Sequence, residues 1–191
     1  MTAGPPDRRI AGGRPGARLC GTMPPMTRKI SAGILLYRHR EGTLEVLLAH
    51  PGGPFFANRD AGHWTIPKGE PDGADELRSA AAREFEEETG HALAAVACDP
   101  AVAPLDLGYV IQASGKHVHC WAVEGDLDPA TSTSNTFEMP WPPGSTRLRT
   151  FPEIDRVAWF TLAEARRRAN PSQAELIDRL DAALGTSGQP A

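Results

Sequence analysis

The sequence predicts an α/β or α+β sandwich in which one central helix lies among several β-strands. Short apolar runs typical of strands occur on both sides of a helical segment at about residues 75–89, and two further helical patterns follow near the C-terminus. The length of 191 residues fits one ordinary domain, and a hydrophobic content of 40% is enough for a buried core. We therefore expect one layered domain.

The predicted strands lie on both sides of the central helix. The run ISAGILLYRH and residues 44–50 form a strand pair joined by a turn. Further short strands are expected at Trp64–Ile66, Ala92–Ala97, Leu107–Gln112, His117–Glu124 and Val157–Phe160. Residues 51–64 and Ser134–Arg149 contain many turn-forming residues and are interpreted as long loops, which in a compact domain are often functional.

Both ends of the chain are expected to lack stable structure. Residues 1–27 are rich in Gly, Pro and Arg without a helical or strand period, which predicts a disordered leader. Helices are expected at Leu162–Arg168 and Gln173–Leu184, and residues 185–191 should fray. The domain is therefore predicted to span residues 28–184.

Charge and cysteine content argue against several classes of protein. A formal net charge of -4 gives no broad positive surface for nucleic acid or an anionic membrane. The apolar runs are too short to span a bilayer, and the N-terminus has no apolar signal core. Cys20, Cys98 and Cys120 form no CxxC pair, which favours reduced thiols over zinc ligands. We expect a cytoplasmic protein.

The helical segment carries an unusual number of acids. Glu84, Glu87 and Glu88 share one face because they are spaced i, i+3 and i+4, whereas Phe85 lies on another face that can pack on the sheet. Asp72 or Asp75 is the expected N-terminal cap, and the glycine after Thr89 is the expected end. Repulsion among the acids would be offset by a divalent cation, and oxygen ligands favour Mg²⁺ or Mn²⁺. The alternative is a solvated charged face.

The acids stand in register with residues before and after them. Asp75 follows Gly69 after five intervening residues, and Arg83-Glu84 follows Asp75 after seven. This spacing, continued through FEEETG, resembles the Nudix box. Asp75 replaces the usual Glu, and His91 replaces the usual aliphatic residue. The resemblance extends over roughly residues 29–184 and is similar to a bacterial subgroup of MutT-like and diadenosine-polyphosphate-hydrolase-like members.

The resemblance implies a Nudix α/β/α sandwich with a central mixed sheet and a role for each box residue. Nudix proteins typically hydrolyse a diphosphate linked to another moiety, usually a nucleoside. By motif position, Mg²⁺ would be held by Glu84, Glu87, Glu88 and the Gly69 carbonyl, and Arg83 would orient the acids. The catalytic set would then be Glu84, which also activates water, with Arg83 and Glu87. In other members the base lies on a loop, and the alternatives here are Glu124 and Glu138.

Several residues outside the box are candidates for substrate binding. Lys68 could neutralise a phosphate, or it could be an exposed turn lysine. Trp141 could stack on a base or ribose, or it could pack the Pro-rich loop, and Glu138 lies on the same segment. His117 and His119 alternate on a strand and share a face, which favours a surface or pocket wall over a metal pair.

The leading hypothesis is a Mg²⁺-dependent pyrophosphohydrolase that acts on a small nucleotide substrate. Candidate substrates are a dinucleoside polyphosphate, a nucleoside triphosphate or a nucleotide sugar such as ADP-ribose. One alternative is a Nudix-like sensor that binds a nucleotide without cleaving it. Another is an RNA 5′-end pyrophosphohydrolase, which the acidic net charge disfavours because no nucleic-acid partner is expected. The resemblance also allows a homodimer.

Overall fold

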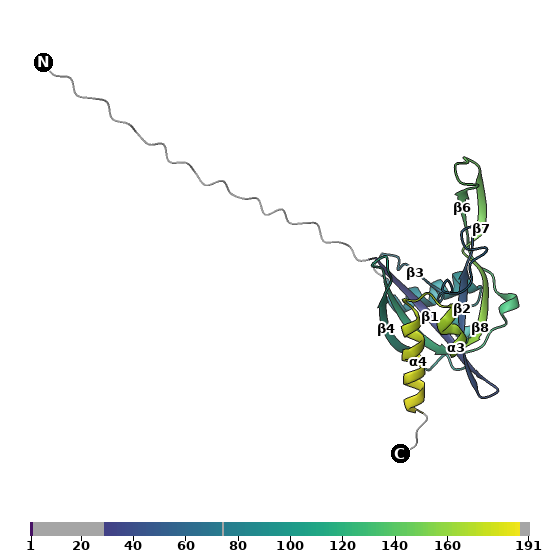
Figure 1. The fold of residues 1–191 in the computed structure, drawn as a ribbon. Helices are drawn as coiled ribbons and strands as arrows, with labels where there is room; N and C mark the ends of the chain where they lie inside the picture. The colour runs from purple at the N-terminus through teal and green to yellow at the C-terminus, as the bar shows by residue number, and fades with distance from the viewer. Residues whose placement is uncertain (2–28, 74, 188–191) are drawn as a thin grey trace.

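The computed structural model describes Met1, residues 29–73 and residues 75–187 (Figure 1). Its centre is a six-stranded sheet with the order β4-β5-β1-β2-β8, and β3 pairs with β1. The strands are β1 (Ile30–Arg40), β2 (Thr43–Pro51), β3 (Lys68–Gly69), β4 (Leu105–Ile111), β5 (His117–Glu124) and β8 (Ile154–Thr161). Because β1 and β5 run parallel while the other pairs are antiparallel, the expected mixed sheet is confirmed.

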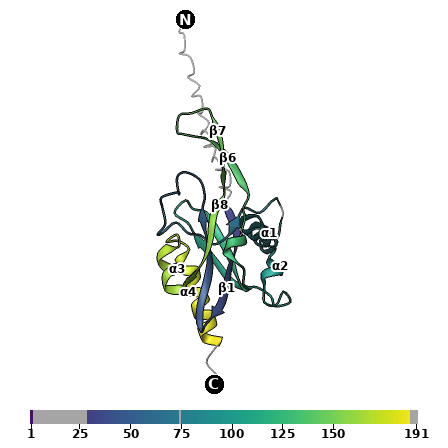
Figure 2. The ribbon, with the colours of Figure 1, turned by 90° about the vertical axis from the view of Figure 1, so that its right-hand side faces the viewer.

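Helices cover both faces of this sheet (Figure 2). The helices α1 (Leu77–Thr89) and α2 (Leu93–Val96) lie on one side, and α3 (Leu162–Arg168) and α4 (Ala174–Ser187) lie on the other. In β1, Ile34 belongs to the core beneath Phe85 of α1, whereas Leu35 belongs to the core that includes Leu176 of α4. Burial on both faces explains why β1 reads as a continuous apolar run.

The ends of α1 differ in how well the sequence predicts them. The helix begins at Leu77, and its N-cap residue Glu76 makes no side-chain cap hydrogen bond, so the predicted caps Asp72 and Asp75 are wrong. The Asp75 N–H instead donates to the Asp72 carbonyl at 3.0 Å, which forms a turn before the helix. The predicted end is confirmed, because Gly90 has a left-handed φ of 76° and its N–H donates to the Glu86 carbonyl at 2.7 Å.

Two predicted short strands are also wrong. Ala92–Ala97 contains the single-turn helix α2, because alanine favours helix over strand. Among the described residues, its backbone pairs with the sheet region through one isolated bridge, from Ala97 to Gly125. Trp64–Ile66 forms isolated bridges, to Ala49 and Ala169, and does not form a regular strand.

The segment predicted as a long loop, Ser134–Arg149, contains most of a β-hairpin. A short 3₁₀ helix at Pro129–Thr131 precedes it. The strands β6 (Thr136–Pro140) and β7 (Leu148–Pro152) pair with each other in a separate two-stranded sheet, which projects from the body in Figure 1. Prolines at the ends of both strands concealed the pattern, because proline is depleted in strand interiors. The prediction of an unstructured loop is therefore wrong.

The C-terminal part of the chain is more regular than expected. The last strand, β8, is longer than the predicted Val157–Phe160, and α4 extends three residues beyond the predicted Leu184, to Ser187. Residues 188–191 and the predicted leader, apart from Met1, lie outside the described residues. Cys98 and Cys120 are free thiols, and Cys20 also lies outside that part of the chain. No helix among the described residues is long and apolar enough to cross a membrane.

The outer strand β4 is irregular and is held by α4. Its pairing with β5 shifts register between Asp106 and Tyr109. Arg179 of α4 donates from one guanidinium nitrogen to the Leu107 carbonyl at 2.7 Å and to the Tyr109 carbonyl at 3.1 Å. The same side chain forms an ion pair with Glu175 at 2.7 Å. These contacts fix the position of β4 at the edge of the sheet.

Candidate active site

A glycine in β3 allows a carboxylate of α1 to lie against the backbone. Gly69 pairs with Ala32 of β1, which places the β3 backbone beside the N-terminal half of that strand. A Cβ atom at Gly69 would lie 1.7 Å from Glu84 Oε2 and 2.0 Å from its Cδ. Any other residue would therefore overlap this carboxyl group. The glycine brings the backbone of residue 69 and the Glu84 side chain together.

Arg83 holds the neighbouring acids in place. Its Nη1 atom lies 2.9 Å from Glu84 Oε1 and donates to Glu87 Oε1 at 3.0 Å. The Nη2 atom donates to the Glu70 carbonyl at 3.1 Å, and Nε is buried without a hydrogen-bond partner. A guanidinium presents several donors in a fixed plane, so one side chain can orient two carboxylates. Arg83 therefore contacts both Glu84 and Glu87, and its orienting role in catalysis stays a prediction.

Glu88 and Lys68 lie in a desolvated part of the same cluster. The Lys68 backbone N–H donates to Glu88 Oε2 at 2.9 Å. Burial raises the pKa of Glu88 to about 7, against the opposing effect of Lys68, and burial likewise raises the pKa of Glu84. Burial lowers the pKa of Lys68, which is partly buried on β3 and not on an exposed turn. The positive charge near these carboxylates is therefore too small to offset the effect of burial on their pKa values.

The residues fit a hard divalent cation, although the described side chains do not converge as a finished metal site. No group of three or more His, Cys, Asp or Glu side chains among the described residues forms a ready ligand set. The reason is that Arg83 holds Glu84 and Glu87, while the Lys68 backbone holds Glu88. The raised pKa values of Glu84 and Glu88, and their carboxylate chemistry, match what Mg²⁺ would stabilise.

The comparison with protein families identifies this arrangement. The family model described as NUDIX domain matches residues 27–180. The chain belongs to the Nudix family. This membership supports a hydrolase that acts on phosphorus-containing anhydrides. No curated protein sequence shows significant similarity to the chain.

Solved structures share the Nudix fold at low sequence identity. An Ap4A hydrolase from C. elegans, solved as a binary complex, has a TM-score of 0.58 and 22% identity, over 82% of this chain and 98% of that one. The NUDIX domain of Shewanella oneidensis NrtR, solved with ADP ribose, has a TM-score of 0.56 and 16% identity, over 82% and 88%. RenU, a Nudix hydrolase from M. smegmatis, has a TM-score of 0.53 and 20% identity, over 86% and 90%.

A carboxylate outside the Nudix box also acts electrostatically on the cluster. The charge of Glu153, at the junction of β7 and β8, contributes to the raised pKa values of Glu84 and Glu88. Its position is set by the base of the hairpin, because the Glu153 N–H donates to the Asn135 carbonyl at 2.8 Å and the Asn135 N–H donates to the Glu87 carbonyl at 3.1 Å. Sequence reasoning missed Glu153 because only the hairpin brings it back to α1.

The two alternative bases proposed from sequence lie elsewhere. Glu124 pairs with Tyr37, five residues along β1 from the partner of Gly69, which corresponds to about 16 Å along the strand. It forms an ion pair with His39 at 3.5 Å. Glu138 is exposed on the projecting hairpin, where it accepts a hydrogen bond from Thr150 at 3.4 Å. Neither carboxylate forms a hydrogen bond or ion pair with the described residues of the Nudix box.

Trp141 contacts one aromatic residue on the loop after β2 and another on β7 of the hairpin. Its ring lies edge-on to Phe55 at a centroid distance of 5.5 Å and to Phe151 at 6.4 Å. These contacts match the packing interpretation of Trp141, since the ring joins the hairpin to the loop that follows β2. Trp64 is buried in the core, while Trp121 and Trp159 are half-buried against the α1 side of the sheet.

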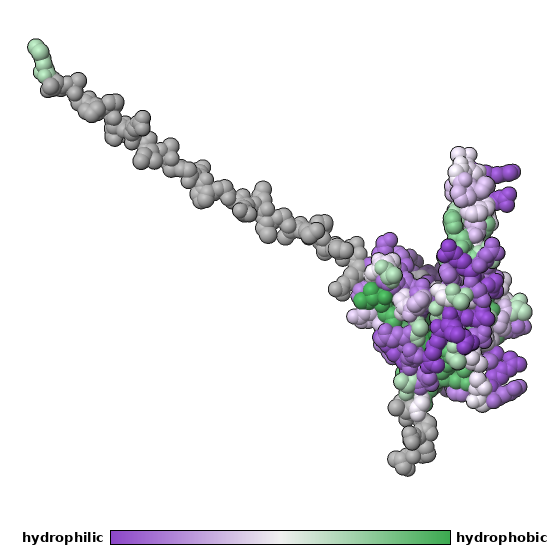
Figure 3. All heavy atoms as spheres, in the orientation of Figure 1, coloured by the Kyte–Doolittle hydropathy of each residue, from purple (hydrophilic) through white to green (hydrophobic). Residues whose placement is uncertain are grey.

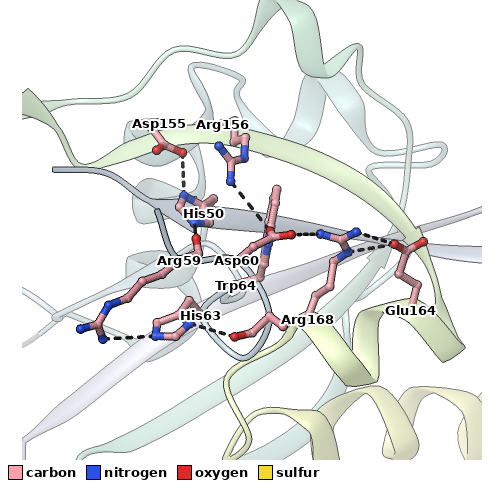
Figure 4. A network of polar contacts seen from close by, with 10 residues as sticks. His50, Arg59, Asp60, His63, Trp64, Asp155, Arg156, Glu164 and Arg168 are labelled. Atoms are coloured by element: carbon pink, nitrogen blue, oxygen red, sulfur yellow. Dashed lines mark hydrogen bonds and ion pairs between the residues drawn. The ribbon is translucent and has the colours of Figure 1, made fainter. Parts of the chain in front are cut away.

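A buried histidine anchors the loop after β2 next to the hairpin base (Figure 4). His50 is fully buried, and its Nδ1 and Nε2 atoms lie 2.8 Å from Asp155 Oδ1 and 2.5 Å from the Arg59 carbonyl. Nearby, Asp60 accepts a hydrogen bond from Trp64 at 2.6 Å and forms an ion pair with Arg168. The network therefore connects the loop to the segment that carries Glu153.

Proposed function

We propose that this protein is a Mg²⁺-dependent pyrophosphohydrolase that cleaves a nucleoside diphosphate linked to another moiety. The observation that carries the proposal is the contact between the Glu84 carboxylate and the backbone of Gly69, within the Nudix box. It supports a site in which the Gly69 carbonyl and the acidic side chains of α1 would together hold Mg²⁺, because these are the oxygen ligands that Mg²⁺ prefers beside substrate phosphates.

Each residue of the cluster has a proposed role. Glu84, Glu87, Glu88 and the Gly69 carbonyl would hold Mg²⁺, which when bound offsets the charge of the diphosphate and lowers the pKa of a coordinated water. Arg83 keeps the carboxylates oriented through the contacts at 2.9 and 3.0 Å.

The proton of the attacking water needs a carboxylate acceptor, and two are available. Glu84 is the candidate within the box, and its raised pKa favours proton uptake. Glu153 is the candidate outside it, because its charge acts on both Glu84 and Glu88. The Lys68 ammonium is available to neutralise a phosphate oxygen. Water then attacks one phosphorus, and the phosphate-bearing fragment leaves.

The substrate is proposed as a small nucleotide such as a dinucleoside polyphosphate, a nucleoside triphosphate or ADP-ribose. Structures with similar folds include an Ap4A hydrolase and a domain bound to ADP ribose. A nucleotide sensor without activity is disfavoured because the box retains Glu84, Glu87 and Glu88. We further propose that the protein works in the cytoplasm, as the free thiols of Cys98 and Cys120 suit a reducing compartment.

The test is a panel of these nucleotides with Mg²⁺, comparing wild type, Glu87→Gln and the matched control Glu86→Gln. Glu86 is exposed on the same helix. We expect Glu87→Gln to lower kcat/KM by about 100-fold or more, because a metal contributes several kcal/mol to the transition state. Glu86→Gln should match wild type. Wild-type activity in Glu87→Gln would disprove the metal assignment, and absence of any product with wild type would favour the sensor.

A further inference from the structure

A row of aromatic and imidazole rings lies on the outer strands of the sheet. The Tyr109 ring of β4 stacks on His117 of β5 at a centroid distance of 5.0 Å and an interplanar angle of 17°. It lies 5.2 Å from His119 at 32°, and His119 lies 6.4 Å from Trp121 at 22°. These four residues are here called the ring row. The Tyr109–His117 and His119–Trp121 pairs are stacked and the Tyr109–His119 pair is tilted, and a further flat ring can stack on an exposed ring of this kind.

The ring row lies on the same face of the sheet as the Nudix box. Trp121 packs against the core cluster that contains Ala32 and Phe85 of α1. His117 and His119 precede it at even spacing on β5, so their side chains point to the same face. The alternate residues, Val118 and Cys120, belong to the opposite core. The ring row and α1 therefore lie on the same side of the sheet.

The pairing of the strands fixes the separation between the ring row and the box. Ala32 of β1 pairs with Gly69 on one side and with His119 on the other. Gly69 and His119 are thus two strand spacings apart, or about 10 Å. A mononucleotide unit is an extended molecule whose base and phosphates lie at opposite ends of a ribose. Tyr109 pairs with His119 on the far side of β5, so it is three strand spacings, or about 15 Å, from Gly69. An extended nucleotide with its phosphates at Gly69 would have to span this distance for its base to contact Tyr109.

A lysine and exposed apolar side chains lie beside the ring row. Lys116, immediately before β5, forms an ion pair with Glu70 at 2.9 Å, and its charge acts on Lys68. Tyr109 is 46% exposed and the neighbouring Ile111 is 56% exposed. Figure 3 shows a hydrophobic patch at the edge of the body that carries β4. An exposed aromatic face beside lysines suits a ligand with a flat base and a phosphate chain.

We infer that the ring row binds the nucleobase of the substrate by stacking, with Tyr109 as the principal contact. This inference rests on the proposed hydrolase function for the identity of the phosphate site. It defines the substrate class as nucleotides and excludes polyphosphates that have no aromatic base. Stacking does not distinguish one base from another, because every base presents a π-face. The ring row therefore supplies affinity for a base without a requirement for adenine.

The first test measures binding, so that it does not depend on hydrolysis. We would titrate ADP and inorganic pyrophosphate, each with Mg²⁺, into wild type, Tyr109→Ala and the control Ile111→Ala by calorimetry. Tyr109→Ala should weaken ADP binding by about 5- to 100-fold, which is the range for loss of one base-stacking contact. Pyrophosphate binding should be unchanged in every variant. Equal ADP affinity in wild type and Tyr109→Ala would overturn the inference.

Two further variants separate stacking from general damage to the strand. Tyr109→Phe keeps the ring and should bind ADP like wild type, whereas His117→Leu removes an imidazole and should weaken ADP binding in the same direction as Tyr109→Ala. Weaker pyrophosphate binding in Tyr109→Ala would overturn the assignment to the base. If Tyr109→Ala selectively loses ADP binding but the wild-type protein hydrolyses no nucleotide, the base-binding role of the ring row stands and the proposed hydrolase function is rejected. If the wild-type protein hydrolyses nucleotides but Tyr109→Ala binds ADP as tightly as wild type, the hydrolase function stands and the base-binding role of the ring row is rejected.

Discussion

The raised pKa of Glu88 leads to a prediction about stability in the absence of metal. Burial raises this pKa from 4.5 to about 7, so the folded protein prefers the protonated acid more than the unfolded chain does. The stability that follows is fully present below pH 4.5 and is lost as the pH rises through 7. At about 1.4 kcal/mol per unit, the loss is about 3.5 kcal/mol, or about 7–14 °C in Tm for a chain of this size.

The assay is thermal unfolding in a chelator between pH 4.5 and pH 8, comparing wild type with Glu88→Gln. The amide imitates the protonated acid and can still accept from the Lys68 N–H, so it should gain stability over wild type as the pH rises. Glu86→Gln, on the exposed face of α1, should follow wild type at every pH. Mg²⁺ should remove the wild-type disadvantage, because it stabilises the ionised carboxylate. A constant difference in Tm between wild type and Glu88→Gln across this range would refute the reasoning.

Two further predictions concern packing around the site. Gly69→Ala should lower kcat by about 100-fold and stability by about 1–3 kcal/mol, because its Cβ would occupy the position of the Glu84 carboxylate. The control is Gly185→Ala, which should keep full activity because a Cβ at Gly185 would meet only open space. A wild-type kcat in Gly69→Ala would contradict the proposed geometry. His50→Ala should cost about 2–4 kcal/mol in urea unfolding, because it leaves buried polar partners unpaired and a cavity. The partly exposed His63→Ala should cost much less, and equal losses would show that the buried network is not a main anchor.

Local sequence patterns predicted the elements whose limits and burial depend on one segment alone. The run that became β1 is apolar on both faces, and Gly90 ended α1 where its left-handed conformation was expected. The spacing from Gly69 to Glu88 predicted that distant residues would meet, and the contact of Gly69 with Glu84 agrees with it. In these cases one segment, or one motif of fixed spacing, contains the information.

The remaining features depend on contacts between segments far apart in sequence. The hairpin β6–β7 has prolines at its strand ends, so its strands show only in their pairing with each other. Glu153 reaches the acidic cluster because Asn135 connects the hairpin base to α1. The ring row forms only because β4 pairs with β5 with a shift in register before Tyr109. The sequence pattern of either strand alone does not show this pairing.

The hydrogen bonds from Arg179 to the β4 backbone limit how two copies of the chain can associate. An outer strand normally presents free carbonyl groups to which a strand of another molecule can add. Here the carbonyls of Leu107 and Tyr109 already accept hydrogen bonds from the guanidinium, and the strand is bent at that point. Two copies of the chain therefore cannot extend one continuous sheet across this stretch of β4. A homodimer of this protein would have to form through another surface, which leaves the exposed ring of Tyr109 open to solvent and ligand.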